Sequence, residues 1–186
     1  MAGTWGAQLD EVVRTRYPRL VAHARLLVRS GGEAEDLVQD ALIRTFSSRA
    51  KLASVPEAEA YVRRAIVTRF LDLQRRRTSE RAAYTRVAGM ADGVPGCENP
   101  ELPHFASEVE IALGCLSPRE RACVVLRHVE DLSIRETAAA LRLTEGAVKR
   151  YTHDGVATLG SILRTSTTTS DDDAIDVITR TGGARR

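Results

Sequence analysis

The strongest constraint on the fold is a pair of Ser-x-x-Glu sequences in the C-terminal half of the chain, Ser117–Glu120 and Ser133–Glu136. A serine at this position can accept the backbone N–H of the glutamate, whose side chain reaches back to the serine N–H. Pro118 strengthens the first signal, because proline fits the first position of a helix. Each sequence therefore predicts the beginning of a helix.

The segment that follows the second cap predicts two packed helices. Ala138 is a small residue at which a following helix can cross closely, and Val148 is the branched residue that the following helix would bury there. The exposed side of that following helix carries Lys149, Arg150 and His153. A short helix, a tight turn over 141–144 and a longer helix with a basic side indicate a helix-turn-helix that reads DNA. The alternative is a helical hairpin with a solvated basic face.

The composition is typical of one domain or two small ones. The chain has 186 residues, of which 43% are hydrophobic and only 4% aromatic, so we expect small aliphatic cores between helices. The net charge is +2, which by itself does not indicate a nucleic-acid partner. The distribution of charge is more informative, because arginines crowd one segment: Arg63, Arg64, Arg69, Arg75, Arg76, Arg77 and Arg81.

No cofactor, metal or membrane association is expected. The N-terminus lacks an apolar run of signal-peptide length and nothing later could span a bilayer, so we expect a cytoplasmic protein without a membrane partner. The three cysteines have no C-x-x-C spacing, which argues against a zinc site.

Four helices are expected in the N-terminal half. An apolar stripe over 9–28 is interrupted by Pro18, which we expect to separate two helices. The segment 33–46 begins with acidic residues, as helices often do, and can turn Leu37, Ala41 and 43–46 inward. A long amphipathic helix is predicted from Glu57 to about Arg77, roughly 30 Å in length.

Two segments lack helical periodicity. Residues 78–107 are rich in glycine and proline and predict a flexible linker, and residues 164–186 predict a disordered tail. The expected organisation is therefore all-α, with a helical domain over 1–77 and a helix-turn-helix domain over 108–163.

Four segments, taken in order, resemble a known family: DLVQDALIRTF, AEAYVRRAIVTRFLDLQRRR, LSPRERACVVLRHVEDLS and LTEGAVKRYTHDGVATL. They are similar to bacterial extracytoplasmic-function (ECF) sigma factors, in particular the SigE-like actinobacterial type. The resemblance covers about 17–163. It implies a subunit that binds core RNA polymerase and promoter DNA, both duplex and melted, to initiate transcription. It also implies an anti-sigma factor as a partner.

The resemblance assigns roles to three sets of residues. It implies that the first segment docks on polymerase through Asp36, Leu37, Gln39 and Asp40. It implies that the arginine-rich helix recognises and melts the minus-ten element through Tyr61, Arg63, Arg64, Thr68, Arg69, Arg75 and Arg76. It implies that the helix-turn-helix reads the minus-thirty-five element through Thr144, Glu145, Lys149, Arg150 and His153.

Four positions depart from the pattern of the family. Tyr61 stands where relatives often have tryptophan, and Thr68 where they often have asparagine. Arg142 occupies a turn position usually held by glycine, so a left-handed backbone there would be strained. Asp154 replaces a commonly basic residue and would repel phosphate.

Two other functions fit these residues less well. A LuxR-type helix-turn-helix regulator would also suit the sequence LSPRERACVVL, but residues 1–77 show no alternating strands and helices of a receiver domain. An enzyme is disfavoured, because G-x-x-x-x-G-K-[ST], H-E-x-x-H and G-x-S-x-G motifs are absent from the sequence.

Overall fold

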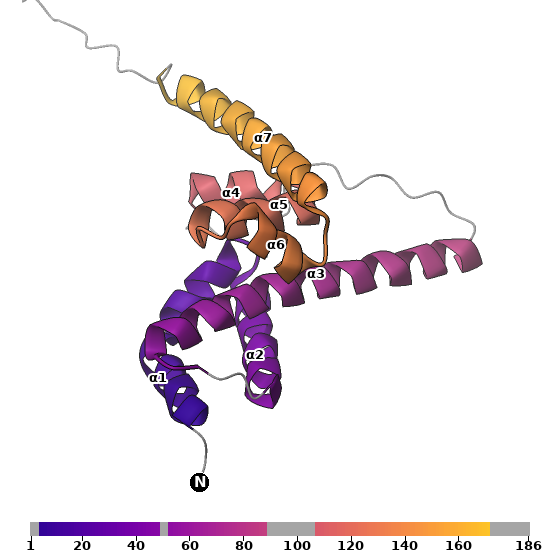
Figure 1. Cartoon of the computed structure of the whole chain (residues 1–186). Coiled ribbons are helices and arrows are strands. Elements are labelled where there is room, and N and C mark those ends of the chain that lie inside the picture. The colour runs from indigo at the N-terminus through magenta and orange to yellow at the C-terminus, as the bar shows by residue number, and fades with distance from the viewer. Residues whose placement is uncertain (1–3, 49–51, 89–106, 172–186) are drawn as a thin grey trace, which may run out of the picture.

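Every regular element of the computed structural model is a helix, within the residues that the structure describes, 4–48, 52–88 and 107–171 (Figure 1). Serine side chains cap several of these helices. The hydroxyls of Ser30 and Ser54 accept the N–H groups of Glu33 and Glu57 at 3.1 and 3.3 Å. The all-α class predicted from the sequence is confirmed.

Three helices form the N-terminal half: α1 (Thr4–Arg25), α2 (Gly31–Ser48) and α3 (Val55–Ala88). Their shared core is apolar and almost fully buried, and it includes Leu9, Leu20, Leu37, Ile66 and Phe70. The predicted break at Pro18 is wrong, because α1 runs through this residue. The helix loses one backbone donor there. Val12 and Leu20, buried on either side of the proline, hold both parts of α1 in the core.

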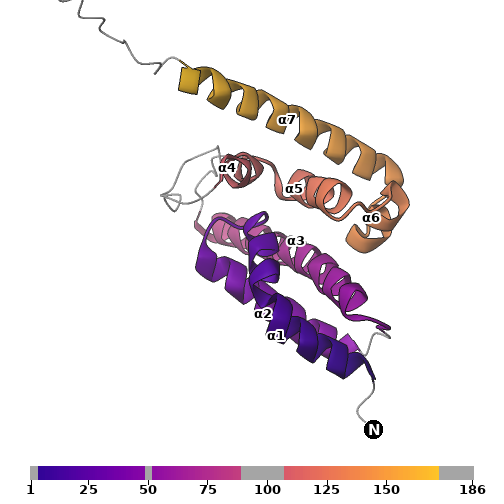
Figure 2. The ribbon, with the colours of Figure 1, turned by 90° about the vertical axis from the view of Figure 1, so that its left-hand side faces the viewer.

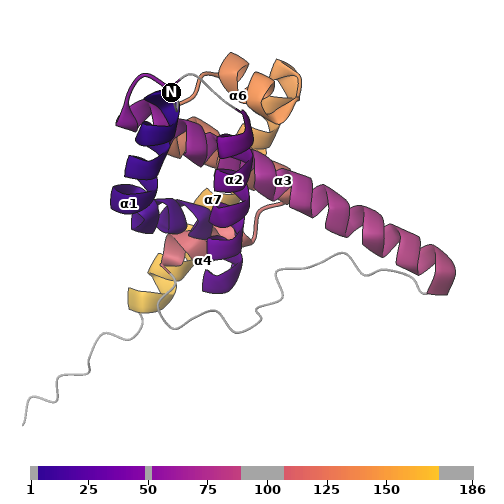
Figure 3. The same ribbon diagram turned by 90° about the horizontal axis from the view of Figure 1, so that it is seen from below.

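Helix α3 is longer than its periodicity predicts. It has 34 residues and so is about 50 Å long. It continues past the expected end at Arg77 to Ala88, and its second half projects beyond the helices that pack on it (Figure 3). Residues 78–88, predicted to be part of a linker, are therefore helical. The rest of that predicted linker, 89–106, lies outside the described residues.

The C-terminal half contains short helices followed by a long one. They are α4 (Glu108–Gly114), α5 (Pro118–Val124), the π-helix η1 (Val125–Val129), α6 (Ile134–Leu141) and α7 (Glu145–Asp171). Both predicted capping boxes are present, at Ser117 and Ser133, and Ser107 forms a further one. Because α7 extends to Asp171, the beginning of the predicted tail is helical, and 172–186 lie outside the described residues.

Helices α6 and α7 make the predicted helix-turn-helix. Ala138 and Val148 are 6% and 0% exposed, as expected for the contact between the two helices. Arg142 ends α6 in the left-handed region, with φ 54° and ψ 47°. The Leu143 N–H then donates to the Ala138 carbonyl at 3.0 Å, which closes the turn.

The two halves pack directly on each other. In Figure 2, α4, α5 and α6 form a layer between α7 on one side and α3 on the other. Arg121 of α5 is 8% exposed, and its guanidinium donates to the Leu27 carbonyl of the N-terminal half at 2.5 Å. The same group donates to the Gly114 and Leu116 carbonyls at 2.7 and 3.1 Å and lies 5.7 Å from the Phe70 ring. One buried side chain thus joins the halves.

Candidate nucleic-acid interface

The exposed face of α2 carries only part of the predicted polymerase-binding set. Asp36 and Gln39 are exposed, whereas Leu37 is 1% exposed and belongs to the core. A protein partner cannot reach the Leu37 side chain, so its predicted role as a contact residue is corrected to a structural one. Asp40 is partly exposed, and its carboxylate is bound by Arg69 of α3.

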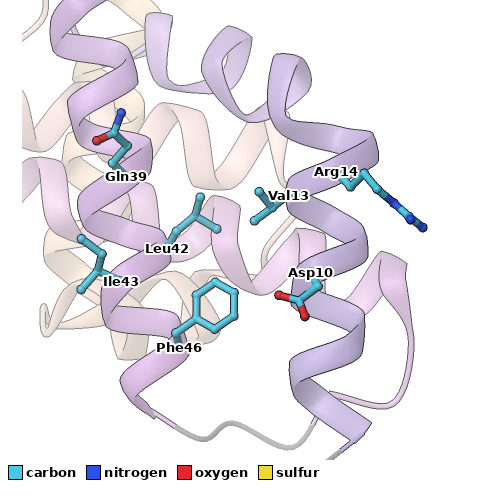
Figure 4. Close-up of a pocket in the computed structure, with 7 residues that line it drawn as sticks. All are labelled: Asp10, Val13, Arg14, Gln39, Leu42, Ile43 and Phe46. Carbon is cyan, nitrogen blue, oxygen red and sulfur yellow. The ribbon is translucent and has the colours of Figure 1, made fainter.

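An open groove of about 450 Å³ lies beside Gln39, between α1 and α2 (Figure 4). Its lining is mainly apolar and consists of Asp10, Val13, Arg14, Gln39, Leu42, Ile43 and Phe46. Figure 4 shows Leu42 and Val13 directed toward each other across the groove and the Arg14 side chain extending away from it. The expectation that Ile43 packs inward is wrong, because this side chain is 65% exposed. Carboxylate and amide groups thus lie next to an uncovered apolar strip.

The predicted minus-ten residues on α3 fall into two groups. Arg75 and Arg76 are exposed beyond the core, with the Arg75 guanidinium 3.7 Å from the Asp72 carboxylate, and Arg64 is half-buried. Others already bind within the protein. Arg69 donates to Asp40, the Thr68 hydroxyl donates to the Ala65 carbonyl at 2.9 Å, and the Tyr61 hydroxyl lies 3.4 Å from the Ser48 hydroxyl.

Arg63 meets a carboxylate from the other half of the chain. Its Nε lies 3.5 Å from Glu130 Oε2, and Glu130 Oε1 lies 3.4 Å from His23 Nδ1. The Glu130 side chain is 4% exposed, and burial raises its pKa although Arg63 and Arg64 act in the opposite direction. Burial, and then the charge of Arg63, lowers the pKa of His23 to about 4. At neutral pH the imidazole is therefore uncharged, and its contact with Glu130 is polar rather than ionic.

The outer face of α7 presents the predicted minus-thirty-five residues. Glu145, Lys149, Arg150 and His153 are exposed, as is Asp154. Thr144 caps the helix, because its hydroxyl accepts the Ala147 N–H at 3.2 Å.

A cationic cluster lies at the edge of this face. The Arg119 guanidinium of α5 donates to the Tyr151 hydroxyl at 3.0 Å, and that of Arg150 lies 5.0 Å from the Tyr151 ring. The hydrogen bond from Arg119 is the main cause that lowers the pKa of Tyr151. The cluster adds Arg119 to the basic surface of α7, although Arg119 lies about thirty residues before Arg150 in the sequence.

Two family models match the two halves of the chain. The model of sigma-70 region 2 matches residues 12–80, and that of sigma-70 region 4 matches residues 107–159. The RNA polymerase sigma-E factor of Streptomyces avermitilis is 35% identical over 152 residues, which cover 82% of this chain and 83% of that protein. The chain belongs to the ECF sigma factors of the sigma-70 family. It directs RNA polymerase to specific promoters and initiates transcription there.

Further relatives agree with this assignment. The ECF RNA polymerase sigma factor SigE of Mycolicibacterium smegmatis is 34% identical over 151 residues, covering 78% of this chain and 58% of that protein. A solved structure of the sigma factor RpoE in complex with the anti-sigma factor NepR from Bartonella quintana has the same fold. Its TM-score is 0.57 at 22% identity, covering 83% of this chain and 95% of that one. The alternative of a LuxR-type regulator is not supported, because the N-terminal half matches sigma region 2.

The described residues show neither a metal cluster nor a spanning segment. No group of three or more His, Cys, Asp or Glu side chains in 4–48, 52–88 and 107–171 is arranged to hold a metal ion. Within the same part of the sigma factor, no helix is both long and apolar enough to cross a bilayer. Cys123 is a buried free thiol, and burial raises its pKa to about 11, so it is not a ready nucleophile.

Sequence reasoning missed several residues that shape these surfaces. Asp40, a predicted polymerase contact, pairs with Arg69, a predicted DNA contact. The helical spacing of apolar residues gives no sign of this ion pair. The apolar groove beside Gln39 depends on the packing of α1, which the predicted break at Pro18 obscured. The cap at Ser54 was readable, because Ser54 and Glu57 have the spacing of a capping box.

Proposed function

We propose that the sigma factor divides its work among three surfaces on two domains. Residues 1–77 and the helical extension of α3 to Ala88 bind polymerase and the minus-ten element, while 108–163 bind the minus-thirty-five element. Core polymerase docks on α2, melted DNA on α3, and duplex DNA on α7. The juxtaposition of exposed Asp36 and Gln39 with the open apolar groove of α1 and α2 is the single observation that most supports this division.

The α2 surface has the character of a protein-binding site. Protein interfaces combine an apolar centre with a polar rim that fixes orientation. Leu42, Ile43 and Phe46 supply apolar area next to the exposed polar groups of Asp36 and Gln39. Asp40 contributes indirectly, since Arg69 already holds its carboxylate.

The α3 surface suits separated DNA strands. Melting a duplex loses base stacking, which must be recovered through contacts with the unpaired bases and their phosphates. Arg64, Arg75 and Arg76 are the arginines of the predicted set that are not bound to Glu130 or Asp40, and Tyr61 offers an aromatic ring nearby in the helix. Arg63 joins them only when Glu130 moves away. Arg69 and Thr68 shape the helix rather than bind DNA.

The α7 surface suits duplex DNA. The side chains of Glu145, Lys149, Arg150 and His153 all point outward from the second helix of a helix-turn-helix, the element that enters the major groove. Lys149 and Arg150 would neutralise phosphates or bind guanine edges. Thr144 positions the helix as its cap, and Asp154 weakens the attraction of the exposed face around His153 for phosphate.

The sigma factor has no catalytic role of its own in this proposal, and polymerase performs the chemistry in the cytoplasm. An anti-sigma factor is a further expected partner. The structural neighbour RpoE is held in a complex with the anti-sigma factor NepR. An anti-sigma factor that covers the α2 face would compete with polymerase for Asp36 and Gln39.

The assignment is tested by two double variants that separate the two binding activities. Asp36→Ala with Gln39→Ala should weaken binding to core polymerase roughly tenfold or more while duplex binding is kept. Lys149→Ala with Arg150→Ala should weaken binding to duplex promoter DNA and reduce the slope of log affinity against log salt by about two, while polymerase binding is kept.

Two control variants make the comparison specific. Glu35→Gln removes an exposed charge on α2 beside Asp36, and Arg19→Ala with Arg25→Ala removes two exposed positive charges on α1. Both should behave like the wild type. If the α7 double variant loses polymerase first, or the α2 double variant loses DNA first, the surfaces have been assigned to the wrong domains.

A further inference from the structure

The turn of the helix-turn-helix contains a residue in an unfavourable backbone conformation. Arg142, which joins α6 to α7, has φ 54° and ψ 47°. This left-handed region favours glycine, because a Cβ comes too close to the following carbonyl oxygen there. Asparagine tolerates the same region better than most side chains do. A residue that stays strained in a fold raises the question of what its side chain contributes.

The fold gives no reason for an arginine at this position. The Arg142 side chain is exposed, and it forms no hydrogen bond or ion pair with another residue of 4–48, 52–88 and 107–171. Backbone groups close the turn, because the N–H groups of Arg142 and Leu143 both donate to the Ala138 carbonyl. A glycine at position 142 would make the same bond without the strain. Stability therefore does not explain the arginine.

The neighbours of Arg142 fix the direction in which it points. Leu141 is 3% exposed, and Leu143 is partly buried against the core. The side chain between them is therefore directed to solvent. Thr144 follows as the cap of α7, and Glu145 begins the helix. Arg142 thus stands immediately before the exposed residues proposed to read duplex DNA.

The position of the turn brings it close to the DNA backbone. In a helix-turn-helix the first helix crosses the backbone, while the N-terminal residues of the second contact base edges in the major groove. Figure 1 shows α6 and α7 meeting at this turn. A residue in the turn passes beside the phosphates that border the groove. Arginine suits this place, because its planar guanidinium can donate two parallel hydrogen bonds to phosphate oxygens.

The exposed face of α7 needs a further cation to bind an anionic ligand. Its charged residues are two cations and two carboxylates: Lys149, Arg150, Glu145 and Asp154. These charges cancel, with His153 neutral at pH 7. Arg119 adds one cation at the edge of the face, where it is bound to the Tyr151 hydroxyl. Affinity for DNA depends on the number of phosphates that lysine and arginine neutralise, so a cation in the turn would strengthen binding directly.

We propose that Arg142 binds a backbone phosphate of duplex DNA beside the major groove, and that the protein keeps a strained turn for this contact. The inference rests on the proposed role of α7 in binding duplex DNA. It predicts two changes of opposite direction. Replacement of Arg142 by glycine makes the fold more stable and the complex with DNA weaker, whereas loss of a structural residue would lower both.

Three substitutions at this one position separate backbone strain from charge. Arg142→Gly and Arg142→Asn remove the charge and relieve the strain, whereas Arg142→Lys keeps both. The full-length proteins are compared by urea unfolding and by fluorescence anisotropy with a labelled duplex DNA of random sequence over a range of salt concentrations. A random duplex is sufficient, because a phosphate contact carries no sequence information. Arg19→Ala, which removes an exposed positive charge on α1, is the control.

The glycine and asparagine variants should unfold at higher urea concentrations than the wild type. They should also bind the duplex roughly three- to tenfold more weakly at low salt. The slope of log affinity against log salt should become shallower by about one, as expected for the loss of one phosphate contact. Arg142→Lys should keep the stability and the slope of the wild type, and Arg19→Ala should match the wild type in duplex affinity and slope.

Three outcomes would overturn the proposal. The first is an Arg142→Gly chain with unchanged affinity and slope. The second is a slope as shallow for Arg142→Lys as for Arg142→Gly, since lysine carries the same charge. The third is an Arg142→Gly chain that is less stable as well as weaker in binding, because the arginine would then support the turn.

The double variant Lys149→Ala, Arg150→Ala, measured alongside, distinguishes this inference from the proposed function. If the double variant weakens duplex binding and Arg142→Gly does not, α7 binds DNA without Arg142. If neither change weakens duplex binding, the assignment of α7 to duplex DNA is wrong as well.

Discussion

Arg69 of α3 donates two hydrogen bonds to one carboxylate oxygen of Asp40 on α2, from Nε at 2.9 Å and from Nη2 at 2.6 Å. The Arg69 side chain is 11% exposed and that of Asp40 is 42% exposed. The pair therefore fixes the crossing of the helix proposed to bind polymerase over the helix proposed to bind melted DNA. Residues expected to contact two different ligands instead contact each other.

Loss of this pair should reduce stability more than it reduces DNA affinity. Arg69→Gln should lower the free energy of unfolding by about 1–2 kcal/mol, because Asp40 loses a charged partner that is only partly replaced by water. A double-mutant cycle with Asp40→Asn, followed by urea unfolding, should give a coupling energy of about 1 kcal/mol. A coupling energy near zero, together with weaker binding of single-stranded DNA by Arg69→Gln but not by Asp40→Asn, would contradict this account. It would show that Arg69 binds DNA phosphate.

Gly155 of α7 should not tolerate a larger side chain. A Cβ at this position would lie 2.8 Å from Val124 Cγ2, so α7 and α5 would have to move apart. Gly155→Ala should lower the free energy of unfolding by about 1–3 kcal/mol, as measured by thermal or urea unfolding. Gly160→Ala in the same helix is the control, because its Cβ would meet only the Arg164 guanidinium at 4.0 Å. The control should be neutral or stabilising, and equal effects at both positions would contradict the close crossing.

Arg142→Gly should stabilise the protein. The left-handed backbone at φ 54° disfavours a residue with a Cβ by about 1–2 kcal/mol, and the greater freedom of glycine in the unfolded chain offsets part of this gain. The expected net increase is about 0.5–1 kcal/mol in urea unfolding. Ala139→Gly, at an exposed position in the interior of α6, should instead destabilise by a similar amount. A destabilised Arg142→Gly chain would mean that the arginine side chain makes an important contact.

His23 should make stability depend on pH in the acidic range. Its pKa is about 4 in the folded protein and near 6.5 when unfolded, so the unfolded chain binds more protons between these values. The stability that His23 contributes is complete above pH 6.5 and is lost as the pH falls toward 4. Between pH 7 and pH 5 the loss should be about 2 kcal/mol.

Comparison with His23→Gln isolates this effect. Glu130 acts in the opposite direction, because a raised pKa lets the folded protein take up a proton first. The wild type and the His23→Gln variant both contain Glu130, so its effect largely cancels when the two are compared. The free energy of unfolding of the wild type minus that of His23→Gln should therefore fall by about 2 kcal/mol from pH 7 to pH 5. A difference that stays constant over this range would show that the imidazole is not buried in its neutral form.

The parts of the fold that depend on local chemistry were predictable from the sequence. The capping boxes at Ser117 and Ser133 and the burial of Ala138 and Val148 are set by residues close in the chain, and each is present. The continuity of α1 through Pro18 was not predictable, because packing against α2 and α3 outweighs the loss of one backbone bond. Ile43 has a core-like side chain but lies on an exposed strip.

The arrangement of the two halves was also beyond prediction. Arg121 and Glu130 read as ordinary charged residues on helical surfaces, and only the tertiary structure brings them to Leu27, His23 and Arg63. Each of these contacts joins residues far apart in sequence, so neither periodicity nor capping can signal it. The family resemblance assigned Arg63 to DNA but gave no reason to expect a carboxylate in its place.

The central claim is that this chain gives core RNA polymerase its choice of promoter. In vitro transcription on genomic fragments, followed by mapping of the 5′ ends, tests it most directly. Core polymerase with the sigma factor should start at discrete sites with a common spacing between upstream and start-proximal sequences, and the Asp36→Ala, Gln39→Ala double variant should abolish these starts. A transcript profile that is the same with and without the sigma factor would contradict the claim.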